Sequence, residues 1–185
     1  MDKITLERIA TLHPKIRKKI LEAYTYINNK LLGKGVRLRF AYTTRTNGEQ
    51  SDLYAQGRTK LFDSKGKRLG IVTKAKAGES IHNYHLAWDI VLLLDKNLDG
   101  IFEEASWDTI LDFDKDGKSD WMEVVEYFKS IGAVWGGDFI FKDFKDAPHF
   151  EMTFGHSWKT LKALYDKGET FTENINGKTY TYARI

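Results

Sequence analysis

The stretch LAWDIVLLL, residues 86–94, places one carboxylate, that of Asp89, inside an otherwise apolar run. Its apolar, branched residues predict a strand in the centre of a sheet. A carboxylate buried in such a strand is costly unless it is paired with another group or coordinates a metal. The run therefore predicts both a sheet and a partner for Asp89.

Helical and extended patterns alternate along the rest of the chain, which predicts an α+β fold. We expect a small, mainly antiparallel sheet flanked by helices, with long loops and a metal site on one sheet face. The segments that carry these patterns are a helix over 12–31 with Pro14 in its first turn, a strand over 36–42, a short helix over 48–58, a helix over 120–131, a strand over 149–154, a helix after the N-cap Ser157, and a hairpin at Asn176-Gly177.

The composition is that of a globular protein, with 42% hydrophobic and 30% charged residues among 185. We expect one domain over residues 1–185, with an acidic insertion at about 95–123 and a C-terminal helix and hairpin over 157–185. No apolar run reaches the roughly 20 residues of a membrane-spanning helix. The first residues also lack the apolar stretch of a secretory signal. We therefore expect synthesis in the cytoplasm without a signal peptide, and no membrane insertion.

The absence of cysteine excludes disulfides and thiolate metal sites, so any metal must take nitrogen and oxygen ligands. Charge is distributed unevenly: residues 1–80 hold 18 Lys or Arg against 7 Asp or Glu, and residues 81–185 hold 11 against 19. The basic half fits an anionic partner, either nucleic acid or a cell-wall polymer. Short segments such as RLRF and KGKR are too ordinary to support nucleic-acid binding, and we expect none. Divalent cations are expected in the acidic half.

Chemically suitable ligands for zinc occur at separate places in the chain. His82 lies seven residues before Asp89, so both side chains can converge if the chain turns after His82 and then enters a strand. His85 competes with His82, because a His-x-x-His pair on a helix can also bind metal. A catalytic zinc needs a third protein ligand and an open position, and His149 is the candidate. Asp146, three residues earlier, is placed to act as a general base rather than as a ligand.

A second metal is predicted by DFDKDGKSDWME, residues 112–123, which fits the twelve-residue calcium loop of EF-hands. The carboxylates at positions one, three, five, nine and twelve and the backbone carbonyl at position seven belong to Asp112, Asp114, Asp116, Asp120, Glu123 and Lys118. An apolar helix follows but no helix precedes, so this is an EF-hand-like loop inserted into another fold. The segment 95–106 begins in the same way but has Ser106 at position twelve, so it predicts a weaker second site.

The zinc ligands and their surroundings resemble a known family. Ser80-x-His82, followed by Asp89 and far downstream by Asp146-x-x-His149, resembles the zinc peptidases of the D-alanyl-D-alanine carboxypeptidase superfamily. Within that group AYTTRTNGEQSDLYAQGRTK, KAKAGESIHNYHLAWDI and IGAVWGGDFIFKDFKDAPHFEM are most similar to L-alanyl-D-glutamate endopeptidases of bacteriophage lysins and bacterial wall hydrolases. The resemblance spans roughly residues 12–165, with the motifs in the expected order.

The resemblance implies three zinc ligands and one catalytic base, which are His82, Asp89, His149 and Asp146. It also implies that Ser80 and Arg45 contact the substrate, with Gln50 a weaker candidate. Relatives usually have glycine where this chain has His85. A side chain there would narrow the cleft or offer the substrate an extra hydrogen bond.

The implied activity is zinc-dependent cleavage of the stem peptides or cross-bridges of bacterial peptidoglycan, at the L-Ala-D-Glu bond, as in an endolysin. We expect a monomer that acts on the bacterial cell wall, which is the host's wall if the protein comes from a phage. Two alternatives stay open. One is a D,D-carboxypeptidase or dipeptidase acting on D-Ala-D-Ala; the other is a non-catalytic, metal-stabilised wall-binding module, which would have no need for a base at Asp146.

Overall fold

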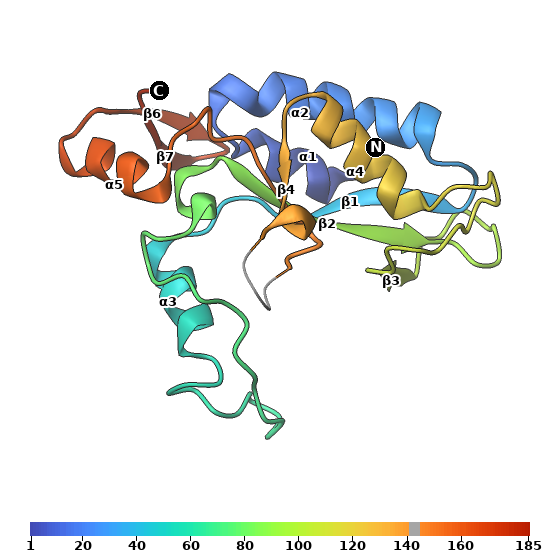
Figure 1. Ribbon diagram of the computed structural model, residues 1–185, viewed down its shortest axis with the longest axis horizontal. Helices are drawn as coiled ribbons and strands as arrows, with labels where there is room; N and C mark the ends of the chain where they lie inside the picture. The colour runs from blue at the N-terminus through green and yellow to red at the C-terminus, as the bar shows by residue number, and fades with distance from the viewer. Residues whose placement is uncertain (141–144) are drawn as a thin grey trace. The chain divides into compact units, whose positions relative to one another are not determined.

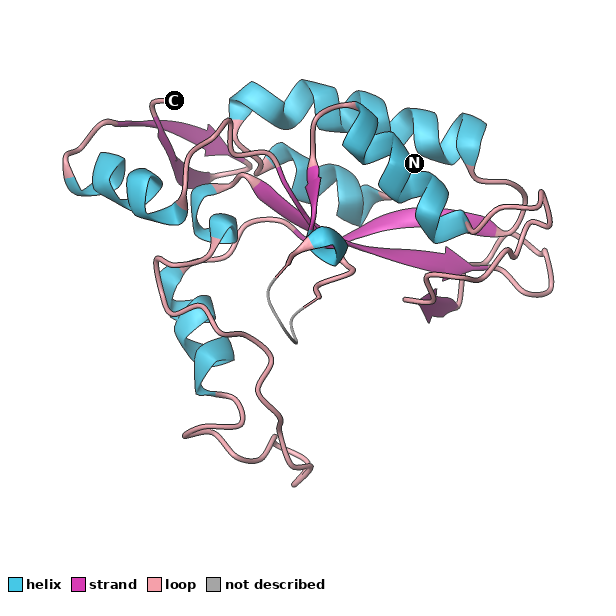
Figure 2. Cartoon of the chain, in the orientation of Figure 1, coloured by secondary structure: helices cyan, strands magenta, loops and turns pink. Residues whose placement is uncertain are grey.

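The computed structural model of this protein describes residues 1–140 and 145–185. The chain forms two compact units, the first made of residues 1–43 and 87–152 and the second of residues 44–86 and 153–185. Helices and strands alternate with long loops (Figure 2), which confirms the predicted mixture of helices with an antiparallel sheet. One domain over the whole chain stays a prediction. Among the described residues, no helix has the length and apolar character that crossing a bilayer requires.

The first unit is built on a five-stranded sheet of described residues in which every strand pair is antiparallel. Its strand order is β1-β2-β5-β4, with β3 also paired to β2, so the predicted central strand is confirmed. In chain order the elements are α1 (Lys3–Ala10), α2 (Pro14–Tyr26), the π-helix η1 (Ile27–Leu31), β1 (Val36–Tyr42), β2 (Ala87–Leu94), β3 (Glu104–Ser106), α4 (Asp120–Ser130), β4 (Val134–Trp135), the 3-10 helix η3 (Gly136–Asp138) and β5 (His149–Glu151).

The core of this unit lies between the sheet and its helices, with α1, α2 and α4 on one side of the sheet (Figure 1). Trp88 of β2 is fully buried and stacks between Phe40 and Phe150, with ring centroids 6.3 and 6.0 Å away. It also meets Phe128 of α4 edge-on at 5.4 Å. Because side chains alternate along a strand, Asp89 lies on the sheet face opposite Trp88, away from α4.

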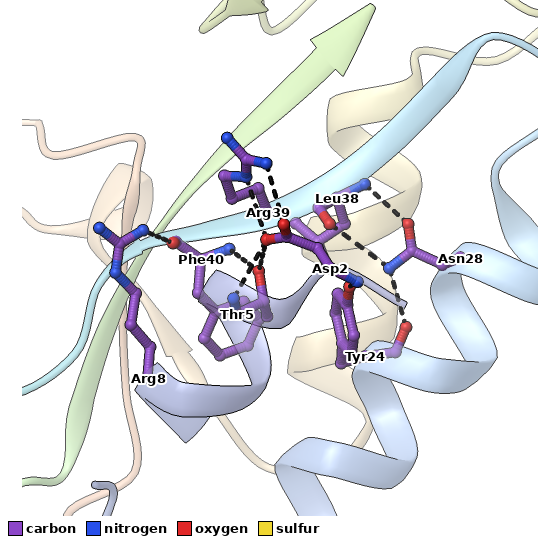
Figure 3. Close-up of polar contacts among 8 residues, drawn as sticks. All are labelled: Asp2, Thr5, Arg8, Tyr24, Asn28, Leu38, Arg39 and Phe40. Atoms are coloured by element: carbon purple, nitrogen blue, oxygen red, sulfur yellow. Dashed lines mark hydrogen bonds and ion pairs between the residues drawn. The ribbon is translucent and has the colours of Figure 1, made fainter. Parts of the chain in front are cut away.

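Side chains from the N-terminal helices form hydrogen bonds with backbone groups on the outer edge of β1 (Figure 3). Asn28 accepts a hydrogen bond from the Leu38 N–H at 2.9 Å and donates to the Leu38 carbonyl at 3.5 Å. The Thr5 hydroxyl accepts from the Phe40 N–H at 3.1 Å, and the Arg8 guanidinium donates to the Phe40 carbonyl. An uncovered edge strand presents such groups to other chains, whereas here they are paired internally.

Asp2 joins α1 to β1 in the same region (Figure 3). Its carboxylate caps α1 by accepting from the Thr5 N–H at 3.1 Å and the Thr5 hydroxyl at 2.6 Å. It also accepts hydrogen bonds from two N–H groups of Arg39, at 2.9 and 3.0 Å. Burial raises the pKa of Asp2, but the hydrogen bonds from Arg39 and Thr5 outweigh it and hold that pKa below its usual range.

Replacing Asp2 by asparagine should lower the free energy of unfolding by about 2 kcal/mol near pH 7, because hydrogen bonds to charged groups contribute roughly 1.5–3 kcal/mol. The pKa of Asp2 is lower in the folded than in the unfolded chain. Its contribution is therefore present above the ordinary carboxyl pKa of about 3.9 and is lost as the pH falls through the folded value. Urea unfolding should show a smaller difference near pH 3 than near pH 7. Glu7→Gln, which breaks an exposed pair with Lys3, should change little at either pH.

The second unit contains a two-stranded sheet and short helices. The predicted hairpin is confirmed: Asn176 and Gly177 have φ angles of 51° and 80°, as a two-residue hairpin turn requires. Ser157 caps the last helix by accepting from the Thr160 N–H at 3.2 Å, also as predicted. The elements are α3 (Asn47–Ala55), the 3-10 helix η2 (Ile81–Tyr84), α5 (Trp158–Asp166), β6 (Thr170–Ile175) and β7 (Lys178–Ala183).

Several predicted boundaries differ from the structure; the short helix expected over 48–58, for example, spans Asn47–Ala55. The helix expected over 12–31 begins at Pro14, because the His13 ring accepts from the Lys15 N–H at 3.1 Å and starts a new helix there. The preceding helix α1 was not predicted. The strand expected over 149–154 ends at Glu151, and positive φ angles of 53° and 82° follow at Phe154 and Gly155.

Candidate metal centre

Asp89 and His149 lie opposite one another on β2 and β5. Oδ1 of Asp89 is 3.3 Å from Nδ1 of His149, and the two side chains are only 18% and 10% exposed. Two ligand atoms about 2.1 Å from a tetrahedral zinc ion would be roughly 3.4 Å apart. The observed separation is thus close to that of two neighbouring zinc ligands, and the Asp89 carboxylate has a polar partner in His149.

Glu151 binds the other ring nitrogen of His149. Its Oε2 lies 3.1 Å from Nε2, and both residues point to the same face of β5 because they are two positions apart. In the neutral ring, a carboxylate at Nε2 favours the tautomer that carries its proton there, which leaves the Nδ1 lone pair available to a cation. Sequence reasoning missed Glu151, although its i+2 spacing from a candidate ligand on a predicted strand was the available signal.

The surroundings of His149 also set its protonation. Burial lowers the pKa of His149, but the hydrogen bonds with Asp89 and Glu151 outweigh burial and raise that pKa to about 9. A metal ligand must be deprotonated at the coordinating nitrogen. A cation that binds at Nδ1 near neutral pH therefore displaces a proton.

Asp146 and His149 are held by one turn. The His149 N–H donates to the Asp146 carbonyl at 3.0 Å, and the Asp146 N–H donates to the Gly136 carbonyl at 3.1 Å. The Trp135 indole N–H donates to the carbonyl of Ala147 inside the turn at 2.7 Å. The half-buried Asp146 thus has a fixed backbone, as a general base requires.

Gly136 is a second residue that sequence reasoning missed. A Cβ atom at this position would lie 2.4 Å from the Asp146 carbonyl oxygen, 3.0 Å from Cβ of His149 and 3.1 Å from Cβ of Asp146. No side chain fits there without moving the turn. Glycine is therefore needed where the backbone passes beside the predicted base and ligand.

His82 lies in the second unit, in η2, where it is buried. Its carbonyl accepts from the Arg45 N–H at 3.2 Å. Oδ1 of Asn83 accepts from the Ser80 N–H at 3.4 Å, and its Nδ2 donates to the Arg45 carbonyl at 2.8 Å. Three predicted site residues, Ser80, His82 and Arg45, are therefore connected within this unit.

The side chain of Arg45 is oriented by Gln50. The guanidinium donates to Oε1 of Gln50 at 3.0 Å, and Nε2 of Gln50 donates to the Ala75 carbonyl at 2.7 Å. Gln50 is fully buried, whereas Arg45 is half-buried. The amide of Gln50 thus bonds within the unit and holds Arg45 in place.

His85 ends η2 in the left-handed conformation, with φ 64°. Glycine adopts this conformation without strain, which agrees with the glycine that the family resemblance implies at this position. Nδ1 of His85 lies 3.1 Å from the Thr44 hydroxyl, and its ring packs on Tyr182 at 4.7 Å. These contacts offset the strain and hold the side chain, which is only 7% exposed.

The acidic loop over residues 112–123 lies in the first unit and gathers its carboxylates into two overlapping groups. Ligand atoms lie within 4.8 Å of one another in each group, the first being Asp112, Asp114 and Asp116 and the second Asp114, Asp120 and Glu123. Burial raises the pKa of Glu123 to about 7, with Asp116 and Asp114 adding to the effect. Burial raises the pKa of Asp120 as well. The Lys118 N–H donates to Oδ1 of Asp116 at 2.9 Å.

Comparison with protein families gives the deciding observation. Residues 73–152 match the family model described as D-alanyl-D-alanine carboxypeptidase. The similarity to this peptidase family covers that segment of the chain. The matched segment includes the three positions of the predicted zinc ligands, the predicted base Asp146 and Glu151.

The chain is also similar to individual proteins. The chain is 47% identical over 119 residues to the peptidoglycan L-alanyl-D-glutamate endopeptidase CwlK of Bacillus subtilis (strain 168), a match that covers 64% of this chain and 62% of the relative. The chain thus spans less than two thirds of the length of that curated relative. A solved structure, the Serratia marcescens L-Ala D-Glu endopeptidase ChiX, is 21% identical with a TM-score of 0.48, covering 83% of this chain and 90% of that one.

Proposed function

We propose that this chain is a zinc peptidase that cleaves the L-alanyl-D-glutamate bond of bacterial peptidoglycan. The observation that carries the proposal is the Asp89–His149 pair, 3.3 Å apart inside the segment that matches the peptidase family. Peptidases of this family are zinc-dependent. The 47% identity to an enzyme named as a peptidoglycan L-alanyl-D-glutamate endopeptidase supports the choice of bond. The site of action would be the bacterial cell wall, where the chain works as a monomer, as an endolysin does.

We propose His82 as the third zinc ligand together with Asp89 and His149, because all three lie in the segment that matches the peptidase family. Two imidazole nitrogens and one carboxylate oxygen form a donor set that suits a catalytic zinc with an open fourth position. When bound, zinc would polarise the scissile carbonyl and lower the pKa of a water molecule toward about 7.

The residues around the metal would each have one task. Asp146 would take a proton from the attacking water as the new C–O bond forms, and give it to the departing amine as the C–N bond breaks. Arg45, oriented by Gln50, offers two parallel N–H donors to a carboxylate of the stem peptide. Ser80 and His85 are proposed as further substrate contacts, with His85 either narrowing the cleft or offering the substrate a hydrogen bond.

Glu151 would position His149 for the metal, which gives a prediction. Glu151→Ala should weaken zinc binding about 10–100-fold, the range found when a carboxylate that orients a metal-bound histidine is removed. Glu151→Gln should lose less zinc affinity, because an amide oxygen can still accept a hydrogen bond from Nε2. Competition with a zinc-binding dye measures the affinity without substrate. Glu104→Ala, which removes an exposed carboxylate paired with Lys96, is the matched control and should bind zinc like wild type.

Calcium is the second metal that we propose, in the loop over residues 112–123. The support is the match of this segment to the EF-hand loop at each ligand position. The proposed ligands are the carboxylates of Asp112, Asp114, Asp116, Asp120 and Glu123 and the backbone carbonyl of Lys118.

Digestion of purified peptidoglycan tests the peptidase proposal. New N-terminal glutamate, identified by mass spectrometry and abolished by a zinc chelator, is the expected product. The family description itself favours one alternative, a D,D-carboxypeptidase, and release of D-alanine would establish that activity instead. A zinc-loaded protein that binds the wall and releases neither product would be a binding module, and the proposal would be wrong.

A further inference from the structure

We infer that the loop over residues 112–123 holds one structural calcium ion, bound by the buried carboxylates at the start of α4, and that the similar loop over residues 95–106 holds none. The identity of the ion in this inference rests on the calcium site proposed above. The inference does not depend on peptidase activity.

The two loops have the same backbone conformation at the turn. In each loop the first carboxylate accepts from the N–H groups of the fifth and sixth residues: Asp112 from Asp116 and Gly117 at 3.2 and 3.0 Å, and Asp95 from Asp99 and Gly100 at 3.1 and 2.7 Å. The fourth and sixth residues of both loops have positive φ angles. These hydrogen bonds form the turn in both cases, so the turn alone does not identify a cation site.

The difference lies at positions nine and twelve of the two loops. Asp120 and Glu123 are 0% and 5% exposed. Oδ1 of Asp120 and Oε2 of Glu123 are buried and have no hydrogen-bond partner in the described part of the chain. Both side chains point to the carboxylate of Asp114, with ligand atoms within 4.8 Å. Buried carboxylate oxygens without partners are costly, and a divalent cation at their meeting point removes that cost.

The corresponding residues of the other loop are placed differently. Glu103, at position nine, is exposed, and Ser106, at position twelve, lies in β3, where it pairs with Leu92 of β2. A strand rather than a helix follows the turn, and neither residue is a buried carboxylate. Within the described residues, no group of three His, Cys, Asp or Glu side chains forms in 95–106.

The choice of calcium follows from the donor atoms. Every ligand in the loop over residues 112–123 is an oxygen, and five of the six belong to carboxylates. Calcium takes six to eight oxygen ligands in flexible geometry, whereas magnesium demands a near-ideal octahedron and retains several waters. Zinc favours nitrogen or sulfur donors beside oxygen.

The loop is also tied to the body of the first unit. Oδ2 of Asp114 accepts from the Gly33 N–H at 2.6 Å, just before β1. A Cβ atom at Gly33 would lie 2.6 Å from the same oxygen. An ion that joins Asp114 to Asp120 and Glu123 therefore connects the chain before β1 to the first turn of α4, and the expected effect is on stability.

Isothermal titration of the calcium-free, zinc-loaded full chain with calcium chloride tests the inference. We expect one calcium ion per chain and at least about tenfold weaker binding of magnesium. Thermal unfolding should shift upward with calcium, the folded-to-unfolded ratio rising about 100-fold when free calcium is 100 times the Kd. Neither readout involves peptidoglycan, so failure of the peptidase proposal would leave both unchanged.

Variants at matching positions of the two loops identify the site. Asp116→Asn should weaken calcium binding about tenfold or more, whereas Asp99→Asn, the same change at position five of the other loop, should not. The Glu123→Gln variant should show no calcium-dependent rise in melting temperature. In calcium-free buffer it should melt no lower than wild type, because the substitution removes a buried charge. Absence of binding at millimolar calcium, two ions per chain, or equal effects of Asp116→Asn and Asp99→Asn would each overturn the inference.

Discussion

Replacing Asp146 by asparagine should reduce turnover of peptidoglycan about 10²–10⁴-fold while zinc content and melting temperature stay close to wild type. Asparagine has nearly the same shape and keeps the backbone contacts with Gly136 and His149, which do not involve the side chain. It cannot accept a proton from water at neutral pH. The loss should therefore appear in kcat, and zinc measured by mass spectrometry should remain at one ion per chain.

The matched control for this experiment is Asp138→Asn in η3. This substitution removes a carboxylate from the same part of the first unit, where Asp138 pairs with Lys129. Its activity should equal that of wild type. If Asp146→Asn retained zinc and turned over normally, Asp146 would not be the base, and the proposed proton transfers would have to be assigned to another group.

Replacing His149 by alanine should abolish measurable activity and weaken zinc binding by more than about 100-fold. This lower limit follows because removing a residue that only orients a ligand already costs about 10–100-fold. The substitution also removes the imidazole ring that contacts Asp89 at 3.3 Å and Glu151 at 3.1 Å. Zinc affinity is measured by competition with a chelating dye, and circular dichroism shows whether the fold is retained.

His156→Ala provides the comparison for that loss. His156 lies in the second unit, and its N–H donates to the Thr153 carbonyl at 3.0 Å, a contact that alanine preserves. Its zinc affinity should match wild type. If a folded His149→Ala variant bound zinc with the affinity of wild type, His149 would not be a zinc ligand and the proposed centre would be wrong.

Much of the fold could be predicted because local patterns and long-range packing agree. The alternation in VRLRFAY marks Val36–Tyr42 with the boundaries seen in β1, and the apolar run around Asp89 marks the central strand. Asn176-Gly177 and Ser157 are short signals whose geometry depends on few neighbours. The missed helix α1 spans only eight residues, of which two, Thr5 and Ile9, are buried, so few positions in its sequence could show a helical period.

The parts of the candidate site that the sequence did not predict depend on contacts between distant segments. Gly136 is needed only because the Asp146 turn packs against it, a distance of ten residues along the chain. Glu151 was recognisable as a neighbour of His149, but its bond to Nε2 depends on the ring orientation that Asp89 favours from another strand. Residue type and spacing identified the candidate ligand on β5, whereas tertiary packing determined the groups that support it.

The side chains that cover the outer edge of β1 restrict how a peptide substrate can be recognised. Many peptide-binding proteins add the ligand to a sheet as one more strand, using free main-chain N–H and C=O groups. At Leu38 and Phe40 those groups already bind Asn28, Thr5 and Arg8. A peptide therefore cannot pair with β1 at Leu38 and Phe40, so backbone pairing at these two residues contributes nothing to recognition of the proposed substrate.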